Sequence, residues 1–302
     1  MQKPGLFIWL LLLSLGVIWG GSFLAVSVGL ESFGPITIAA IRVTIAAVII
    51  LIASYALGHG LPTFKTPKGR RTWLHCLGMA LFSNAIPFVL LSWGQLNVSS
   101  GFAGITMAVV PLLVLPLSHY LIPGARMTRK KALGFGIGFI GVIILVGPAR
   151  ILQSGGSDVE NMARIACITA SLCYACGTII TRLTPPGHVL AFSAAALVLA
   201  SIILIPLSLI LEGIPTDITL KSAAGVAYLG ILPTALATVM LVHIVKTAGP
   251  PFLSLVNYQV PIWAVLIGAV ALNEAVQSQT VYALGLILLG LAISQFKFGR
   301  FQ

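Results

Sequence analysis

Long stretches without a charged residue alternate with short charged clusters along this chain of 302 residues. A helix needs about 20 mostly apolar residues to cross the hydrocarbon core of a bilayer, and a charge near its centre costs several kcal/mol. The charge-free stretches are 4–30, 43–64, 72–125, 132–149, 165–181, 183–211, 222–245, 247–273 and 275–296. Eight of them have room for one crossing and 72–125 has room for two. The pattern therefore predicts an all-α membrane protein with ten transmembrane helices.

The ten helices are predicted at 6–29, 35–57, 73–92, 100–121, 131–147, 163–182, 189–211, 222–244, 251–271 and 278–296. Composition agrees, because hydrophobic residues make up 58% of the chain and charged residues only 8%. A soluble domain carries roughly a quarter of its residues charged. The first apolar run is long enough to stay in the membrane, so we expect no cleaved signal peptide.

The net charge of +11 would suggest a nucleic-acid partner in a soluble protein. Here the basic residues lie in short loops between apolar segments, without a recognisable nucleic-acid-binding module. We therefore expect the lipid bilayer, and not nucleic acid, to be the partner of these charges.

Lys and Arg are distributed unequally between the two sides of the predicted bundle. With the amino terminus inside, the cytoplasmic segments hold 13 of the 17 basic residues, and all six acidic residues fall on the other side. Loops rich in Lys and Arg stay on the cytoplasmic side of a membrane. We therefore predict a multi-pass protein of the bacterial inner (plasma) membrane with both termini in the cytoplasm.

The two halves of the chain share short patterns at a nearly constant separation. Pro111 and Pro261 are 150 residues apart, and Ala132-Leu133-Gly134 recurs 151 residues later as Ala283-Leu284-Gly285. These separations indicate a duplicated unit with five helices.

Because five is odd, the second copy must begin on the opposite side of the membrane from the first. We therefore predict two inverted repeats, a first five-helix unit over 1–149 and a second over 150–302. Inverted repeats are common in alternating-access transporters, whose solute sites lie near the midplane between the halves.

Three motifs in order along the chain resemble one family. Trp19-Gly20-Gly21-Ser22-Phe23 lies in the first helix, Pro35 with Arg42 opens the second, and Pro261 through Asn273-Glu274 closes the ninth. Together they resemble the ten-helix EamA-type exporters of the drug/metabolite transporter superfamily. The resemblance covers essentially the whole chain, and it implies export of amino acids and related metabolites, aromatic amino acids among them.

Two departures from the family pattern leave the substrate undefined. Gly124-Ala125 stands where the family usually has a Glu after the fourth helix, and the second half lacks the Trp-Gly pattern of the first helix. A particular solute therefore does not follow from the resemblance.

Four prolines lie inside predicted helices at similar depths of the two halves: Pro87, Pro111, Pro233 and Pro261. Each removes a backbone donor and kinks its helix. In lipid the freed carbonyls must be satisfied by protein or by water in a cavity. We expect these kinks to open a central cavity and to act as gating hinges; plain helix curvature is the alternative.

Arg42 is the only formal charge well inside a predicted helix, about 10 Å from its outer end at 1.5 Å per residue. An ionisable residue at this depth suggests a functional site, here one that attracts a substrate carboxylate. The alternative is a structural arginine that snorkels to the interface or donates to helix-end carbonyls, and the family resemblance favours it.

Uncharged polar and aromatic side chains near the centres of the helices are the other candidates for a substrate-binding site. Amides and hydroxyls would bind the polar groups of a neutral or zwitterionic metabolite, and aromatic rings would cover its apolar part. The alternative is hydrogen bonding between helices, about 0.6 kcal/mol each on average. The candidates are Trp19, Ser22, Asn84, Tyr174, Thr178, Asn257, Tyr258, Gln259 and Trp263.

The sequence lacks the motifs of several enzyme and metal-binding classes. No Walker A motif, metal-ligand helix or Ser/His/Asp set appears, so we expect no cofactor, no metal and no enzymatic activity. Cys173-Tyr174-Ala175-Cys176 has CxxC spacing inside an apolar helix, where small packing residues are favoured over redox or zinc chemistry. The GxxxG step at Gly134 and Gly138 is expected to pack the fifth helix against the tenth; a homodimer face is the alternative.

The sequence thus favours a secondary transporter that exports small amino-acid-like metabolites by alternating access. A multidrug or nucleoside/purine exporter of the same fold is the nearest alternative. A channel would need a filter or charge ring, which the sequence does not offer. A lipid-modifying enzyme and a non-transporting scaffold are the remaining classes. The cargo, the coupling ion, the direction of transport and the oligomeric state do not follow from the sequence.

Overall fold

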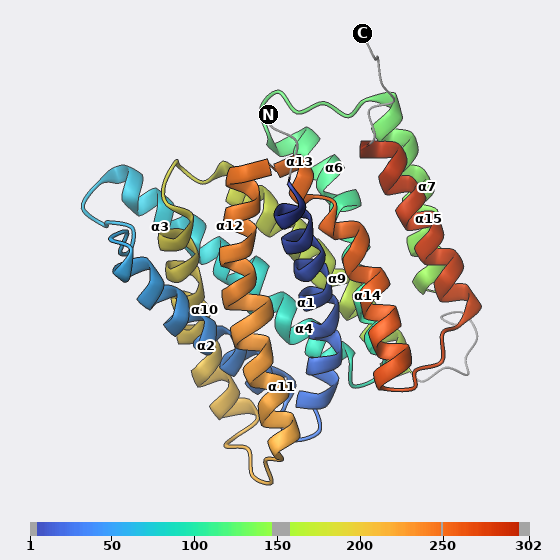
Figure 1. The fold of residues 1–302 in the computed structure, drawn as a ribbon, viewed down its shortest axis with the longest axis horizontal. Helices are drawn as coiled ribbons and strands as arrows, with labels where there is room; N and C mark the ends of the chain where they lie inside the picture. Colours follow the sequence, from blue (N-terminus) through green and yellow to red (C-terminus); the bar gives the residue numbers. More distant parts are fainter. Residues whose placement is uncertain (1–4, 147–157, 249, 296–302) are drawn as a thin grey trace.

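The computed structural model describes residues 5–146, 158–248 and 250–295, and within these ranges it is helical and without strands (Figure 1). Ten helical stretches correspond to the ten predicted crossings. They are α1 (Leu6–Gly29); α2 (Pro35–Ala56); α3 (Pro67–Met79), η1 (Ala80–Ala85) and α4 (Ile86–Gly94); α5 (Ser100–Thr106), η2 (Met107–Val109) and α6 (Val110–Leu121); α7 (Arg129–Val146); α9 (Asp158–Leu183); α10 (Val189–Leu211); α11 (Leu220–Gly230), η3 (Ile231–Leu236) and α12 (Ala237–Ala248); α13 (Pro250–Leu253) and α14 (Val256–Ala271); and α15 (Ser278–Gln295).

Among the described residues, seven stretches are long and apolar enough to cross a membrane. Val256–Ala271 and Ser278–Ser294 are shorter apolar helices, and α7 begins with three basic residues. The chain is therefore a multi-pass integral membrane protein. We call the end of the bundle where α1 begins and α6 ends the upper end, and the end where α2, α11 and α15 begin the lower end, as in Figure 1.

Helix pairing follows an internal two-fold relation between the halves. Helix α2 of the second span packs on α10 of the seventh, and α7 of the fifth span packs on α15 of the tenth. In each case a span of the first repeat contacts the equivalent span of the second. The contacts of α1 with α11 and α12 have their counterparts in those of α9 with α3 and α4, and the contact of α1 with α14 in that of α9 with α6. The prediction of ten helices in two inverted five-helix repeats is confirmed. Its boundary at 149/150 lies outside the described residues.

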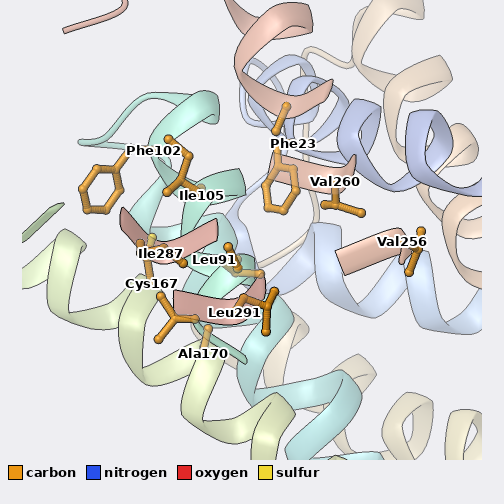
Figure 2. Close-up of a cluster of buried hydrophobic side chains, with 14 of the residues drawn as sticks. Phe23, Leu91, Phe102, Ile105, Cys167, Ala170, Val256, Val260, Ile287 and Leu291 are labelled. Carbon is orange, nitrogen blue, oxygen red and sulfur yellow. The ribbon is translucent and has the colours of Figure 1, made fainter. Parts of the chain in front are cut away.

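One apolar core is shared by both halves. Phe23 of α1, Leu91 of α4 and Ile105 of α5 meet Cys167 of α9 and Ile287 of α15, together with further small and branched side chains (Figure 2). Because this core joins helices from both repeats, neither repeat buries its apolar faces alone.

Glycine allows the closest helix approach, between α7 and α15. An added Cβ at Gly290 would meet the backbone of Gly134 and Gly138, and one at Gly141 would lie 2.9 Å from Ala283 O. The predicted packing of the fifth helix on the tenth is therefore confirmed, with small residues at the contact.

Candidate functional site

Two π-helical turns interrupt the bundle at corresponding places in its halves. η1 and η3 lie near the middle of the third and eighth spans. In each, a side chain donates to a carbonyl five residues earlier, Asn84 Nδ2 to Met79 O at 3.1 Å and Thr234 Oγ1 to Leu229 O at 2.8 Å. π-helical turns occur frequently at functional sites. The buried Asn84, predicted to bind substrate, thus hydrogen-bonds the backbone of its own helix.

Pro87 and Pro233 do not occupy equivalent positions relative to the two π-helical turns. Pro87 comes after η1, whereas Pro233 lies within η3, so the two are not equivalent in the structure. Asn84 and Thr234 are the equivalent pair, because both make the same hydrogen bond within a π-turn. The pairing of Pro87 with Pro233 by depth is therefore offset by about one helical turn.

The fourth and ninth spans also break at corresponding positions. The Met107 N–H donates to Gly104 O as the helix tightens into η2, and the Asn257 N–H donates to Ser254 O at 3.2 Å between α13 and α14. Both are i→i−3 bonds, and a proline follows four residues later in each case. Pro111 and Pro261 therefore occupy equivalent positions, next to discontinuities of the kind that transporters place at their solute sites.

Arg42 extends from α2 to the second half. Its Nε donates to Thr234 Oγ1 at 2.8 Å, and its guanidinium carbon lies 3.8 Å from the centroid of the Phe88 ring. Thr234 in turn donates to Leu229 O, the carbonyl that Pro233 leaves without its helical donor. Within the described ranges no carboxylate forms an ion pair with Arg42. A hydroxyl and an aromatic face therefore hold this cation, without neutralising its charge.

Trp19 joins the same region from α1. Its Nε1 donates to Pro233 O at 3.0 Å, and Ser22 Oγ donates to Trp19 O at 2.6 Å. Tyr228 of α11 donates its hydroxyl to Ile18 O at 3.1 Å, next to Trp19 in the chain. These bonds fix the middle of α1 against the kinked eighth span.

Tyr174 of α9 completes this group. Its ring meets the Phe88 ring edge-on, with centroids 6.4 Å apart. Thr178, one turn further along α9, is exposed and donates to Tyr174 O at 2.8 Å. We call Trp19, Arg42, Phe88, Tyr174 and Thr234 the Arg42 cluster. Of the predicted binding residues, the structure brings Trp19, Arg42 and Tyr174 together there, whereas the hydrogen bond of Thr178 is to the backbone of Tyr174 on its own helix.

Two of the predicted residues of the ninth span, Gln259 and Trp263, lie at the contact of α14 with α1. An added Cβ at Gly16 would lie 2.8 Å from Gln259 Oε1, and one at Gly20 would lie 2.5 Å from Trp263 Cβ. The Tyr258 hydroxyl and Gln259 Oε1 are buried and have no hydrogen-bond partner among the described residues. Buried polar atoms of this kind call for a bound water or ligand.

Two carboxylates join the halves at the lower end: Glu274, which ends the motif of the ninth span, and Glu212, which lies in no motif. Glu212, at the end of α10, accepts from the Ile36 and Thr37 N–H groups at 2.9 and 2.8 Å. Glu274, after α14, accepts from the Ser100 and Gly101 N–H groups at 2.7 and 3.0 Å. A sequence signal existed for the first contact, because α2 begins after Gly34, which offers no capping side chain.

Glu274 also faces a polar cavity of about 280 Å³ at the lower end. The cavity lies between α5 and α7 of the first half and α9, α14 and α15 of the second. Arg164, only 6% exposed, lines it with Glu160, and their Nη2 and Oε1 atoms are 2.6 Å apart. No pattern in the sequence marks this site, because Arg164 lies at the edge of a predicted span and has no motif around it.

The cysteines lie in packed positions. Cys173 is buried, Cys176 is half-buried, and all four cysteines are free thiols. In the described part of the chain, no group of three or more His, Cys, Asp or Glu side chains is arranged to hold a metal ion.

Comparison with known proteins gives one family match over nearly the full length. The model of the EamA-like transporter family matches residues 6–147 and 161–295. A crystal structure with 20% sequence identity superposes with a TM-score of 0.67 and covers 95% of this chain and 96% of its own. At that identity the structure supports the fold alone.

Curated relatives are also similar over most of their length. The Escherichia coli K12 protein named uncharacterized inner membrane transporter YedA is 26% identical over 93% of this chain and 88% of its own. A Streptantibioticus cattleyicolor protein named probable terminal-alkyne amino-acid exporter is 27% identical over 88% of this chain and 86% of its own. An Archaeoglobus fulgidus protein named uncharacterized transporter is 26% identical, over 94% and 97%.

Proposed function

Because the chain belongs to the EamA-like transporter family, we propose that it is a secondary transporter that exports small amino-acid-like metabolites, neutral or aromatic amino acids among them. The two repeats, 1–149 and 150–302, would rock against each other by alternating access. The upper end would face the cytoplasm, because the Lys/Arg-rich loops lie there. The membrane would be the inner membrane of a bacterium, as the name of the E. coli relative suggests.

The observation that carries the proposal is the environment of Arg42. A cation in the middle of a membrane protein is costly without compensation. Here a hydroxyl and an aromatic face orient the guanidinium and no described carboxylate neutralises it. An incoming carboxylate would form a charge-assisted pair with this planar donor group.

The surrounding groups suit the remainder of an amino acid. Trp19 and Tyr174 offer aromatic surface in the Arg42 cluster. The buried Tyr258 hydroxyl and Gln259 Oε1 offer unoccupied hydrogen-bonding capacity. The name of the S. cattleyicolor relative supports an amino-acid class of cargo. We therefore assign substrate binding to these residues and gating to the prolines near the π- and 3₁₀-turns, with no catalytic step.

The test is flux of radiolabelled L-leucine, L-phenylalanine, nucleosides and a cationic drug in proteoliposomes, with and without a pH gradient. Arg42→Gln should lower amino-acid flux about tenfold or more, because a charge-assisted hydrogen bond contributes about 1.5–3 kcal/mol. Arg182→Gln, an exposed arginine at the end of α9, is the matched control and should keep the flux. Amino-acid flux that is unchanged in Arg42→Gln and Tyr258→Phe would contradict the assignment of the site.

A further inference from the structure

The polar cavity at the lower end has no role in the function proposed above. Its walls include Glu160 and Arg164 of α9, Phe102 of α5, and Glu274 and Gln277 from the segment between α14 and α15. At about 280 Å³ it is at the small end of ligand pockets. It therefore has the size for a metabolite and lies at the contact between the two repeats.

The charged groups in this cavity are held in place by contacts with neighbouring residues of the protein. Arg164 is fixed by Glu160 on its own helix, and its guanidinium carbon lies 5.4 Å from the centroid of the Phe102 ring. Glu274 is fixed by the two N–H groups that begin α5. Each carboxylate oxygen has more than one acceptor position, so capping a helix leaves Glu274 able to accept further hydrogen bonds.

The charges of the described lining residues do not cancel. One arginine and two glutamates give a formal charge of −1, which favours a ligand with a cationic group. A simple amine would bring its positive charge beside the Arg164 guanidinium, and a simple carboxylate would face two anions. A zwitterion presents both signs within one small molecule.

We propose that this cavity is a second solute site, which binds a free amino acid with its ammonium group at Glu274 and Glu160 and its carboxylate at Arg164. The choice of amino acids rests on the proposed function; the requirement for a zwitterion rests on the cavity alone. With the upper end in the cytoplasm, this site is where an exported solute pauses before release. Glu274 then joins solute binding to the contact between the repeats, because the same carboxylate caps α5.

Site-resolved alkylation tests the proposal. Gln277→Cys places a thiol in the cavity wall, and mass spectrometry distinguishes its modification by a maleimide from that of the four native cysteines. The probes are L-leucine, L-phenylalanine, isoamylamine and isocaproate; the last two are leucine without its carboxylate and without its ammonium group. At a concentration of about twice its Kd, leucine should slow alkylation about threefold. Isoamylamine should protect less, and isocaproate should not protect.

Substitutions test whether the protection by leucine arises from binding in this cavity. Glu274→Gln or Glu160→Gln, in the Gln277→Cys background, should abolish protection by leucine. Glu212→Gln is the matched control, because Glu212 also caps a helix of the other repeat but does not line the cavity. Protection should persist in Arg42→Gln if the two sites are separate. Size-exclusion chromatography identifies any variant that fails to fold.

The outcomes separate the two proposals. Equal protection by leucine and isocaproate, protection that survives in both glutamine variants, or no protection by either amino acid would overturn the second site. Amino-acid flux without protection would leave the proposed function standing and refute the second site. Protection without flux in the same preparation would leave the second site standing and refute the proposed function.

Discussion

At the residue scale, one proline explains how a charge is held inside the bundle. Pro233 lacks an N–H, so Leu229 O loses its α-helical donor. Thr234 supplies a hydroxyl to that carbonyl and accepts from Arg42 Nε. The carbonyl of Pro233 itself, the residue before Thr234, accepts a hydrogen bond from Trp19 Nε1. A kink that would otherwise leave polar groups unsatisfied in lipid therefore organises the polar contacts of three spans.

Removing the Thr234 hydroxyl should expose that dependence. Thr234→Val leaves Leu229 O and Arg42 Nε without their partner, and each buried unsatisfied group costs about 1–3 kcal/mol. We expect a lower melting temperature in detergent, measured by tryptophan fluorescence. Thr234→Ser keeps the hydroxyl and should stay close to the parent protein. Equal destabilisation by Val and Ser would show that the methyl group, and not the hydrogen bonds, matters at this position.

At the element scale, small residues decide which helices can touch. Gly290 of α15 meets the backbone of Gly134 and Gly138 on α7, whereas an added Cβ at Gly285 of the same helix would meet nothing within 4 Å. The two glycines differ in their neighbours and not in their helical setting. They form a matched pair for measuring close helix packing.

Alanine at these two positions should have opposite effects. Gly290→Ala forces α7 and α15 apart and should cost about 1–3 kcal/mol, as overpacking usually does. Gly285→Ala should be neutral or stabilising by up to about 1 kcal/mol, because alanine favours helix more than glycine does. Unfolding by heat or denaturant in detergent measures both. Equal stability of the two variants would mean that the α7–α15 contact is looser than the structure indicates.

The sequence was sufficient for the spans but not for their irregularities. Charge-free windows located ten helices because lipid excludes charge over a fixed length. They could not reveal the break at Ser254–Leu255, nor η1 and η3, where the Asn84 and Thr234 side chains bond backbone carbonyls. The same limit hid the contact that Glu212 makes and left the Glu274 of the family motif without a structural role. An acidic residue beside a span looks like an ordinary loop charge until the fold brings a helix amino terminus to it.

At the scale of the whole molecule, the two ends are joined by different contacts. At the lower end, charged and hydroxyl groups bridge the repeats: Glu212 and Glu274 cap α2 and α5, and Lys221 Nζ lies 2.6 Å from Glu31 Oε1. At the upper end the contacts between repeats include rings, with Trp9 edge-on to Phe252 and His59 stacked on His188. The proposed alternating-access mechanism would require the polar contacts of the lower end to break in each cycle.

A reversible cross-link should therefore stop transport. Ser32 Oγ and Thr219 Oγ1, one from each repeat, are 3.5 Å apart at the lower end, and the Sγ atoms of two cysteines at these positions must approach to about 2.05 Å to form a disulfide. The double variant Ser32→Cys/Thr219→Cys should lose solute flux on oxidation and regain it with dithiothreitol, because the bond holds the lower end closed. The single variants should transport under both conditions. Full flux through protein that mass spectrometry shows to be completely cross-linked would mean that solute passes without separation of the repeats at this end.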